Sequence, residues 1–475
     1  MGGEAFAGAR FVTQGCWRTP GGLVCEFRPG GADCKGGERA YRRRLEGVWA
    51  AGWARCGRFT ESGRAGKMQR LGGVGIGRYG SEHDRGAGHE VREGVLESSL
   101  RDDHVAEILD RLRRWLDSSG CGGIVLSEPG GVAWATGGMN PAIDRSSATD
   151  LLWAVVGRRQ QAIITTVVER VRVEQDFAPA AHGFELIAVP WFGESQFVDA
   201  AVRFLGRPAE TLATDGHPAF GVQAHEAVVR ARLAHTILAR AELRRLGAET
   251  AAAIEQALST WVPGEVDRAI QARIVGELEL RGAEAVTAIV SGDVRVERFR
   301  HPMAAGVPLQ RLAMAVIVAR RGGLHVAATR IACAGGVDPE LAARLALVRR
   351  VESAVLEECI PGSTYGRAAL ALGHGYAAIG QPLAWQEHYQ GGPIGYAGRE
   401  FEFAPAERGS RWWNCPIEVG HAVAWNPSLA GGAKVEDTFL VGLEGLECIT
   451  PPGEWPTEVA GPSPGVQRAA VLYVS

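Results

Sequence analysis

The sequence has no run of about 18 uninterrupted apolar residues, the length that a membrane-spanning helix needs. Its amino terminus also lacks the basic stretch followed by an apolar stretch that marks a secretory signal. We therefore expect a cytoplasmic protein without a membrane partner.

Charge of one sign is also missing. The 51 Lys and Arg against 54 Asp and Glu give a formal net charge of −3. Such a balance provides no overall basic field, so nucleic acid is not expected as a partner and a small-molecule substrate is favoured. With 475 residues, the chain is long enough for two or three domains that each bury a stable core.

Cysteine is too scarce for a disulfide scaffold, because nine residues are spread over the chain and the odd count leaves one unpaired. No CxxC spacing joins the early cysteines Cys16, Cys25, Cys34 and Cys56. We expect reduced thiols and no zinc site there.

Residues 1–97 are rich in Gly and Arg and show little helical or strand period. We expect this extension to be largely disordered. It contains a GxGxxG match, residues 75–80, but neither a strand before it nor a helix after it is indicated, so we interpret it as a chance match.

Residues 98–225 alternate between helix and strand signals, which predicts an α/β domain. Apolar residues recur at helical spacing from Val105 to Leu116, before Gly120. Residues 123–126, 161–168 and 184–189 read as strands, 196–204 as a helix, and 130–138 as a loop around Trp134.

Residues 226–450 begin with long Ala-, Leu- and Arg-rich helices, one over 228–261 and a second after Pro263 and Gly264. Strand signals follow at 286–290, 312–318, 323–332, 422–425 and 438–443. This order predicts an α+β domain with helices packed on a curved antiparallel sheet, followed by a tail over 451–475.

A series of short motifs runs through this second domain in a fixed order. They are Ile289-Val290-Ser291-Gly292, Arg300-His301-Pro302, Ala327-Ala328-Thr329-Arg330, Gly391-Gly392-Pro393-Ile394-Gly395, Arg399-Glu400, Trp425-Asn426-Pro427 and Lys434-Val435-Glu436-Asp437-Thr438. Their order and spacing resemble the pita-bread superfamily of aminopeptidase P, Xaa-Pro dipeptidase, methionine aminopeptidase and creatinase.

The resemblance implies an α+β pita-bread carboxy-terminal domain preceded by a smaller α/β creatinase-like domain. It also implies a homodimer, since creatinase-like proteins are dimers. An α/β domain before the pita bread suits the creatinase and Xaa-Pro aminopeptidase branch.

The metal ligands of that superfamily are mostly replaced in this chain. The positions of its two Asp, one His and two Glu fall on Val316, Ala327, Gly392, Asn426 and Glu436. A shift of register does not restore them, because residues 294–337 contain no Asp and a single acid, Glu297. Hard divalent cations need several anionic oxygens, so we predict no metal and no other cofactor.

The resemblance implies a metal-independent, creatinase-like hydrolase that acts on a C–N bond of a small amino-acid-like substrate. His301 takes the place of a creatinase histidine and is the predicted general base. The other predicted catalytic residues are Glu436 and Asn426. The predicted substrate-binding residues are Arg330, His388, Gln390, Tyr396, Arg399 and Lys434, and their cationic excess favours a substrate that carries a carboxylate.

Each role has an alternative. His301 would also suit a turn before a Pro, and Arg330 would also suit an ion pair with Glu436 between two strands. For the whole protein, the alternatives are a non-catalytic binding module and a metal-dependent Xaa-Pro aminopeptidase. A thiol nucleophile at Cys333 or Cys415 is not favoured, since no known signature surrounds either residue.

Overall fold

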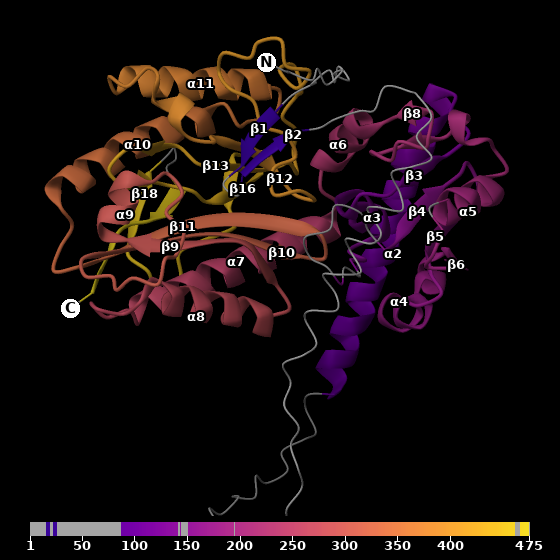
Figure 1. Ribbon diagram of the computed structural model, residues 1–475, viewed down its shortest axis with the longest axis horizontal. Helices are drawn as coiled ribbons and strands as arrows, with labels where there is room; N and C mark the ends of the chain where they lie inside the picture. Colours follow the sequence, from indigo (N-terminus) through magenta and orange to yellow (C-terminus); the bar gives the residue numbers. More distant parts are fainter. Residues whose placement is uncertain are drawn as a thin grey trace, which may run out of the picture. The chain divides into compact units, whose positions relative to one another are not determined.

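The computed structural model describes residues 87–140, 143, 151–193, 195–460 and 466–474, together with a hairpin near the start of the chain (Figure 1). The hairpin pairs β1 (Cys16–Thr19) with β2 (Gly22–Cys25) and belongs to a separate unit, Met1–Ser81. Glu82–Ser475 form the second unit. Most of the extension that we expected to be disordered, and the GxGxxG match within it, lie outside the described residues.

The first long helix, α2 (Ala87–Ser119), starts about three turns before residue 98, where the sequence predicted the domain to begin. Its predicted apolar face is confirmed, since the side chains from Val105 to Leu116 at helical spacing are buried. The helix ends before Gly120, whose φ of 74° suits a residue without a Cβ.

The amino-terminal lobe is built on a six-stranded mixed sheet with the order β6-β5-β4-β3-β7-β8. We use this name for the sheet and helices α2 to α5. The strands are β3 (Ile124–Leu126), β4 (Trp153–Val156), β5 (Gln161–Thr166), β6 (Glu185–Val189), β7 (Ala213–Thr214) and β8 (Val222–Gln223). The helices that follow α2 are α3 (Pro129–Thr136), α4 (Arg170–Phe177) and α5 (Gln196–Leu205). The α/β character predicted for this region is confirmed.

One predicted loop is a helix. Residues 130–138 were expected to form a loop because of their glycines, but α3 spans Pro129–Thr136. Pro129 occupies the first turn, where a missing N–H costs nothing, and Gly137 closes the helix in the left-handed conformation. The glycines allow close packing: a Cβ on Gly131 would lie 2.3 Å from the Asp215 carboxylate.

The carboxy-terminal lobe, our name for α6 and everything after it, starts with two helices where the sequence predicted one. The expected helix over 228–261 is divided into α6 (His225–Leu233) and α7 (Ile237–Ser259). The break falls at Thr236, whose side-chain oxygen accepts a hydrogen bond from the backbone N–H of Ala239 and so begins a new helix. The helix predicted after Gly264 is α8 (Asp267–Leu280).

Two sheets carry the rest of this lobe. The first has the order β20-β11-β10-β9 and the second the order β12-β13-β16-β17. The strands are β9 (Glu284–Gly292), β10 (Leu312–Arg321), β11 (Leu324–Ala334), β12 (Gly391–Ile394), β13 (Ala422–Trp425), β16 (Thr438–Val441), β17 (Leu446–Cys448) and β20 (Leu472–Val474). Strand β20 lies in the segment predicted as a tail and pairs in parallel with β11.

Helices lie on the outer sides of the two sheets. In Figure 1, α7 and α8 lie on one side of β9–β11, and α10 (Pro339–Glu357) and α11 (Tyr365–Ala378) lie on the other. A short helix, α9 (Asp293–Arg298), follows β9 directly. The predicted arrangement of helices on an antiparallel sheet is confirmed, with β20 as a parallel addition at its edge.

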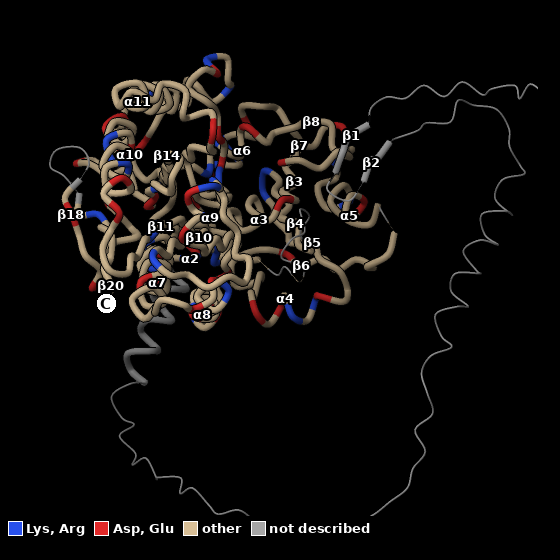
Figure 2. The backbone as a smooth tube through the Cα atoms, turned by 60° about the vertical axis from the view of Figure 1, so that its left-hand side comes forward, with Lys and Arg blue, Asp and Glu red and all other residues tan. Residues whose placement is uncertain are grey.

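Buried polar contacts join the two lobes. The His104 ring in α2 contacts the Thr236 hydroxyl at 2.6 Å and the Trp134 carbonyl at 2.7 Å. Burial lowers the pKa of His104, so the ring is neutral near pH 7. Figure 2 shows basic and acidic residues interspersed along the described chain, and no described helix is long and apolar enough to cross a membrane.

Candidate functional site

The candidate site lies on a two-stranded ladder of the carboxy-terminal lobe. Strand β13 pairs with β16, and β14 (Ser428–Leu429) pairs with β15 (Ala433–Lys434) in the same register. Extending this register across the gap places Asn426 opposite Glu436. Because side chains two residues apart in a strand share a face, Asn426, Ser428, Lys434 and Glu436 belong to one face of the ladder.

Glu436 is buried in this face, with 1% of its surface exposed. One carboxylate oxygen, Oε1, pairs with Arg399 Nη2 at 2.5 Å, and the other, Oε2, has no hydrogen-bond partner among the described residues. Burial raises the pKa of Glu436, while Arg399 and Lys434 oppose the rise. The site therefore holds one carboxylate oxygen that is available to a ligand donor.

Two further oxygens near Glu436 are buried without a partner in the part of the chain that the structure describes. They are Asn426 Oδ1 and Thr329 Oγ1. The Thr329 backbone N–H donates to the Glu436 carbonyl at 2.9 Å, which puts β11 beside this ladder. Buried polar groups are nearly always paired, so three unpaired oxygens in one place indicate a site that expects a water or a ligand.

A group of nitrogens lies beside these oxygens. Lys434 Nζ donates to the Arg300 carbonyl at 3.0 Å and lies 2.9 Å from His388 Nε2. Burial lowers the pKa of Lys434 to about 8, and burial together with Lys434 lowers that of His388 to about 3. His388 is therefore neutral at pH 7, its Nε2 accepts from Lys434, and its Nδ1 carries a proton with no described partner.

His301 completes the nitrogen group. Its ring centroid lies 4.8 Å from that of His388, and the ring is exposed to solvent on one side. Partial burial and the neighbouring Lys434 charge lower the pKa of His301 below its ordinary value. The ring is thus neutral at pH 7 and reachable by water, as a general base must be.

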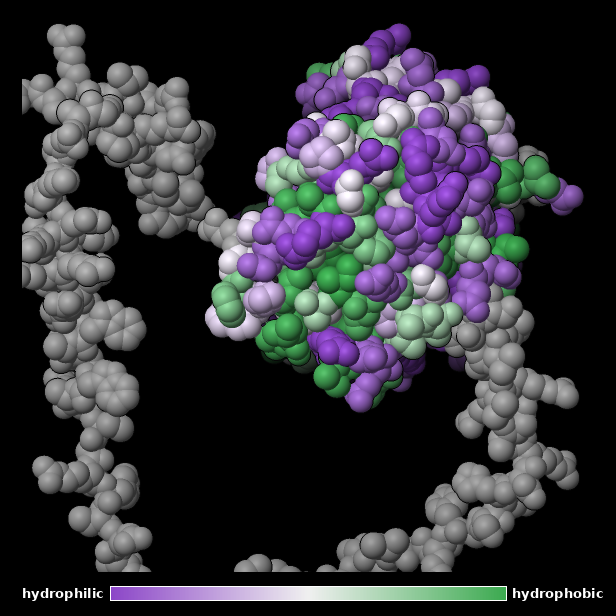
Figure 3. All heavy atoms as spheres, turned by 90° about the vertical axis from the view of Figure 1, so that its right-hand side faces the viewer, coloured by the Kyte–Doolittle hydropathy of each residue, from purple (hydrophilic) through white to green (hydrophobic). Residues whose placement is uncertain are grey.

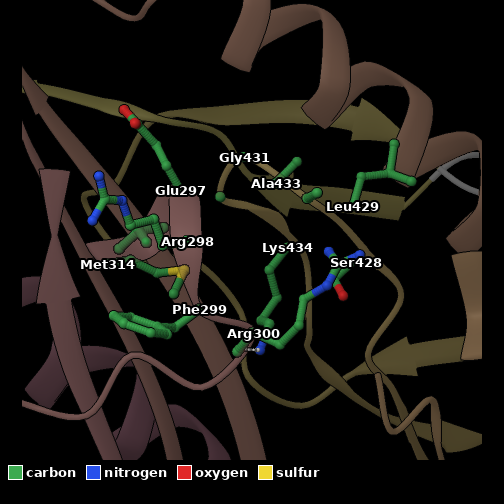
Figure 4. A pocket seen from close by; sticks show the side chains of 13 residues that line it. Glu297, Arg298, Phe299, Arg300, Met314, Ser428, Leu429, Gly431, Ala433 and Lys434 are labelled. Atoms are coloured by element: carbon green, nitrogen blue, oxygen red, sulfur yellow. Dashed lines mark hydrogen bonds between the residues drawn. The ribbon is translucent and has the colours of Figure 1, made fainter. Parts of the chain in front are cut away.

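The space around these groups is small. A cavity of about 40 Å³ runs along Lys434, with Arg300 and Ser428 close to it and Glu297 and Arg298 farther away (Figure 4). A second cavity, of about 20 Å³, is lined by Thr329 and Glu436 among others. Either space suits a water or a group of a few atoms in the conformation described.

Gln390 positions the loop that carries His388. Its amide nitrogen donates to the carbonyls of Trp385 and His388, at 3.0 and 2.8 Å, and its oxygen accepts from the Tyr376 hydroxyl at 3.0 Å. These bonds occupy both ends of the amide. The geometry therefore favours a supporting role for Gln390 over direct contact with a substrate.

The Arg330 guanidinium takes no part in this group, although the residue also lines the cavity of about 20 Å³. Its guanidinium is fully enclosed, with Nε bonded to Glu255 at 3.0 Å and Nη1 to Asp437 at 2.8 Å. Its Nη2 donates to the Thr450 carbonyl at 2.8 Å. The ion-pair alternative is thus favoured for Arg330, although its partners are Glu255 and Asp437 and no contact with Glu436 is found among the described residues.

Tyr396 is likewise outside the ladder face. It follows β12 and lines a different cavity, of about 140 Å³, together with Arg101 and Arg321. Of the predicted substrate-binding residues, the structure brings His388, Arg399 and Lys434 together with the predicted catalytic His301, Asn426 and Glu436.

The residues that the resemblance assigns to the superfamily's metal positions do not fit a pair of divalent cations. Val316 and Ala327 are apolar and buried, and the one remaining acid, Glu436, is already paired with Arg399. Gly392 has a φ of 151°, and a Cβ there would lie 3.2 Å from the Phe401 carbonyl, so a histidine would be strained. In the described residues, no group of three or more His, Cys, Asp or Glu could hold a metal ion.

Sequence reasoning missed Thr329 and Ser428. Thr329 is the cross-strand partner of Val316 in the β10–β11 ladder, and it lies within a motif that had been noted. Ser428 stands two residues after Asn426, and its hydroxyl is also buried without a described partner. Strand alternation outward from Asn426 and Ala327 would have pointed to both residues.

No protein-family model matches the sequence, and no curated protein sequence matches it. Solved structures do match. A Xaa-Pro dipeptidase from Bacillus anthracis is 18% identical with a TM-score of 0.60, over 78% of this chain and 100% of that chain. Dipeptidase PepE from Mycobacterium ulcerans is 18% identical with a TM-score of 0.62, over 78% and 99%.

A third match is not named as a peptidase. The N-terminal domain of FACT complex subunit SPT16 from Cicer arietinum is 11% identical with a TM-score of 0.55, over 74% of this chain and 97% of that chain. These likenesses show the fold. The chain has the pita-bread architecture of the Xaa-Pro dipeptidases, as the order of its motifs predicted.

Proposed function

We propose that this protein is a metal-independent hydrolase that cleaves a C–N bond in a small amino-acid-like substrate, with His301 as the general base. The observation that carries the proposal is the neutral, water-accessible His301 beside Lys434 and the unpaired oxygens of Asn426 and Glu436. The fold adds support, since several of the similar structures are dipeptidases.

The roles follow from donor and acceptor chemistry. His301 takes a proton from water, which attacks the carbon of the C–N bond, and the imidazolium then returns the proton to the leaving nitrogen. Glu436 and Asn426 accept hydrogen bonds from the substrate nitrogen. Lys434, the Nδ1–H of His388 and Arg399 are donors suited to an oxyanion or a substrate carboxylate.

The site replaces a dication with fixed cationic side chains. Arg399 neutralises Glu436 directly, and Lys434 lies close enough to influence the pKa values of both Glu436 and His301. A metal bound here would meet this positive charge and would lack anionic oxygens. The donor set therefore favours chemistry that does not pass through a metal.

The test is capture and turnover of metabolites. Purified protein is incubated with a small-molecule extract, and mass spectrometry compares transformed species for wild type, His301→Asn and an exposed-histidine control, His374→Asn. We expect a hydrolysed species with wild type and the control and a loss of about 100-fold or more with His301→Asn, the usual scale for a lost general base. Equal turnover by His301→Asn would remove His301 as the base.

A second candidate is a non-catalytic binding module, and two observations favour it. The cavities at Lys434 and Glu436 are small, and the amino-terminal lobe exposes Trp191 and Phe192, at 71% and 62%. Figure 3 shows hydrophobic residues gathered on this face of the protein. Contiguous exposed apolar surface marks protein contacts in other proteins. Retention of a ligand without turnover, in wild type and His301→Asn alike, would select this candidate.

A further inference from the structure

We infer that the cavity between the two lobes is a second ligand site, which binds a small organic carboxylate. The cavity of about 140 Å³ is separate from the ladder face and its lining does not include His301, Lys434 or Glu436. Its lining comes from α2, the end of α3, α7, the β10–β11 turn and Tyr396. Ligand sites often form where two lobes meet, with a few polar groups on an apolar lining.

Arg101 supplies the first cation. It is half-buried in α2 and makes no hydrogen bond or ion pair with any described residue. Nearby Asp102 contacts His182 instead, at 2.7 Å. A guanidinium at a cavity wall without a counter-ion offers its planar donors to an anion that enters the cavity.

Arg321 supplies a second set of donors, on one edge of its guanidinium. Its Nη1 bonds to Glu249 and to the Arg281 carbonyl. Its Nε and Nη2 are buried without a hydrogen-bond partner among the described residues, and Nε makes only a longer ion pair with Glu242, at 3.7 Å. Nε and Nη2 form the parallel two-donor edge that fits the two oxygens of a carboxylate. A modest shift of Glu242 would open this edge to a ligand.

Tyr396 supplies a neutral donor. The residue is buried, with 4% of its surface exposed, yet none of the described residues hydrogen-bonds to its hydroxyl. The hydroxyl is not among the fully buried atoms that lack a partner, so it reaches open space. Tyr396 lines this cavity beside Leu238, Ala239 and Leu324, where the hydroxyl can donate to a ligand oxygen.

The balance of charge and apolar lining determines the ligand class. Three arginines line the cavity, namely Arg101, Arg245 and Arg321. Arg245 pairs with Glu242, and Arg321 pairs with Glu249 and, at 3.7 Å, with Glu242, so the positive charge without a described counter-ion is that of Arg101. The apolar side chains of Leu238, Ala239 and Leu324 are a poor match for a fully hydrated inorganic anion. A carboxylate with a short apolar body, such as butyrate, satisfies both sets of contacts and suits a volume of this size.

The experiment is isothermal titration calorimetry of the full chain with sodium butyrate, at constant ionic strength set with sodium chloride. We expect saturable binding of one butyrate per chain. Arg101→Gln and Tyr396→Phe should each weaken the affinity tenfold or more, because each removes one donor without changing the packing of the lobes. Arg114→Gln is the matched control on the same helix, where Arg114 is 69% exposed and pairs with Asp110, and it should leave the affinity unchanged.

A parallel titration with sodium phosphate separates the two kinds of oxyanion. Weaker binding of phosphate than of butyrate supports the proposal, and tighter binding of phosphate overturns the assignment to an organic acid. Absence of saturable butyrate binding, or equal affinity in wild type, Arg101→Gln and Tyr396→Phe, also overturns it. Because Tyr396→Phe keeps the ring, it provides a second reading if Arg101→Gln fails to fold. None of these outcomes depends on turnover at His301.

Discussion

Thr329 and Arg330 are neighbours in β11, and Glu436 and Asp437 are neighbours on the adjoining segment. The surroundings of Arg330 and Asp437 nevertheless differ from those of Thr329 and Glu436. Arg330 and Asp437 belong to a buried network in which Asp437 also contacts Arg468 at 3.0 Å and Thr450 at 2.8 Å. Thr329 and Glu436 each retain a buried oxygen without a described partner.

The difference separates structural charge from chemically available charge. Although burial alone would raise it, the pKa of Asp437 lies below its ordinary value because Arg330 and Arg468 surround the carboxylate. Burial raises the pKa of Glu436, and Arg399, its one ion-pair partner among the described residues, offsets the rise only in part. A fully paired network holds strands together, whereas a partly paired carboxylate is suited to a ligand.

The largest expected loss of stability comes from breaking the buried ion-pair network of Arg330 and Asp437. Arg330→Met leaves Asp437 and Glu255 buried with fewer partners, so the free energy of unfolding should fall by about 3–5 kcal/mol. Denaturant unfolding measures this loss. The control is Arg244→Met, which breaks an ion pair with Glu447 in which both side chains are about half exposed. Its loss should not exceed about 1 kcal/mol. Similar losses of stability in the two variants would show that the buried network of Arg330 contributes no more than an exposed ion pair.

Stability against acid should sharpen the same distinction. The depressed pKa of Asp437 means that its ionised form stabilises the fold above the ordinary carboxyl pKa of about 4, and that this contribution is lost as the pH falls below that value. Wild type should therefore lose stability on acidification more steeply than Asp437→Asn. Parallel unfolding curves for the two proteins between pH 5 and pH 3 would count against this account.

The rate of the proposed reaction should depend on pH through the nitrogen group. The pKa of His301 is lowered, so the base stays neutral down to below pH 6.5, and the rate should fall about tenfold per unit only at more acidic pH. Lys434 loses its proton near pH 8, so the rate should decline again above that value if Lys434 acts as a donor. A pH–rate profile measured with the captured substrate tests both the acidic and the alkaline decline. Lys434→Met should remove the decline above pH 8.

The smallest expected change in stability comes from the ladder face, where Asn426 Oδ1 and Glu436 Oε2 have no described partner. Asn426→Leu removes a buried oxygen without a described partner, so unfolding should become harder by about 1 kcal/mol while turnover is lost. Leu429→Val, a change of packing in the same hairpin, serves as the control and should lower stability while keeping turnover. Destabilisation by Asn426→Leu would show that the amide has a structural role.

Much of the fold could be predicted from local patterns. The buried positions of α2 follow a helical period, and β13 was predicted with its observed bounds, because a single periodicity fixes both. The predictions failed where local and tertiary signals compete. The glycines of α3 suggested a loop, but they allow the helix to pack against Asp215, and the division between α6 and α7 depends on a single cap at Thr236.

The candidate site, too, depends partly on local sequence and partly on tertiary contacts. From the sequence alone, the resemblance assigned Val316, Ala327, Gly392 and Asn426 to the superfamily's metal positions, because side-chain chemistry is written in the chain. Only the tertiary structure decided the partners: Lys434 with His388, and Glu436 with Arg399. It also decided that Arg330 pairs with Asp437, 107 residues away, and that Tyr396 lines another cavity. Such contacts depend on strand register and on which lobe packs against which, and no local periodicity specifies either.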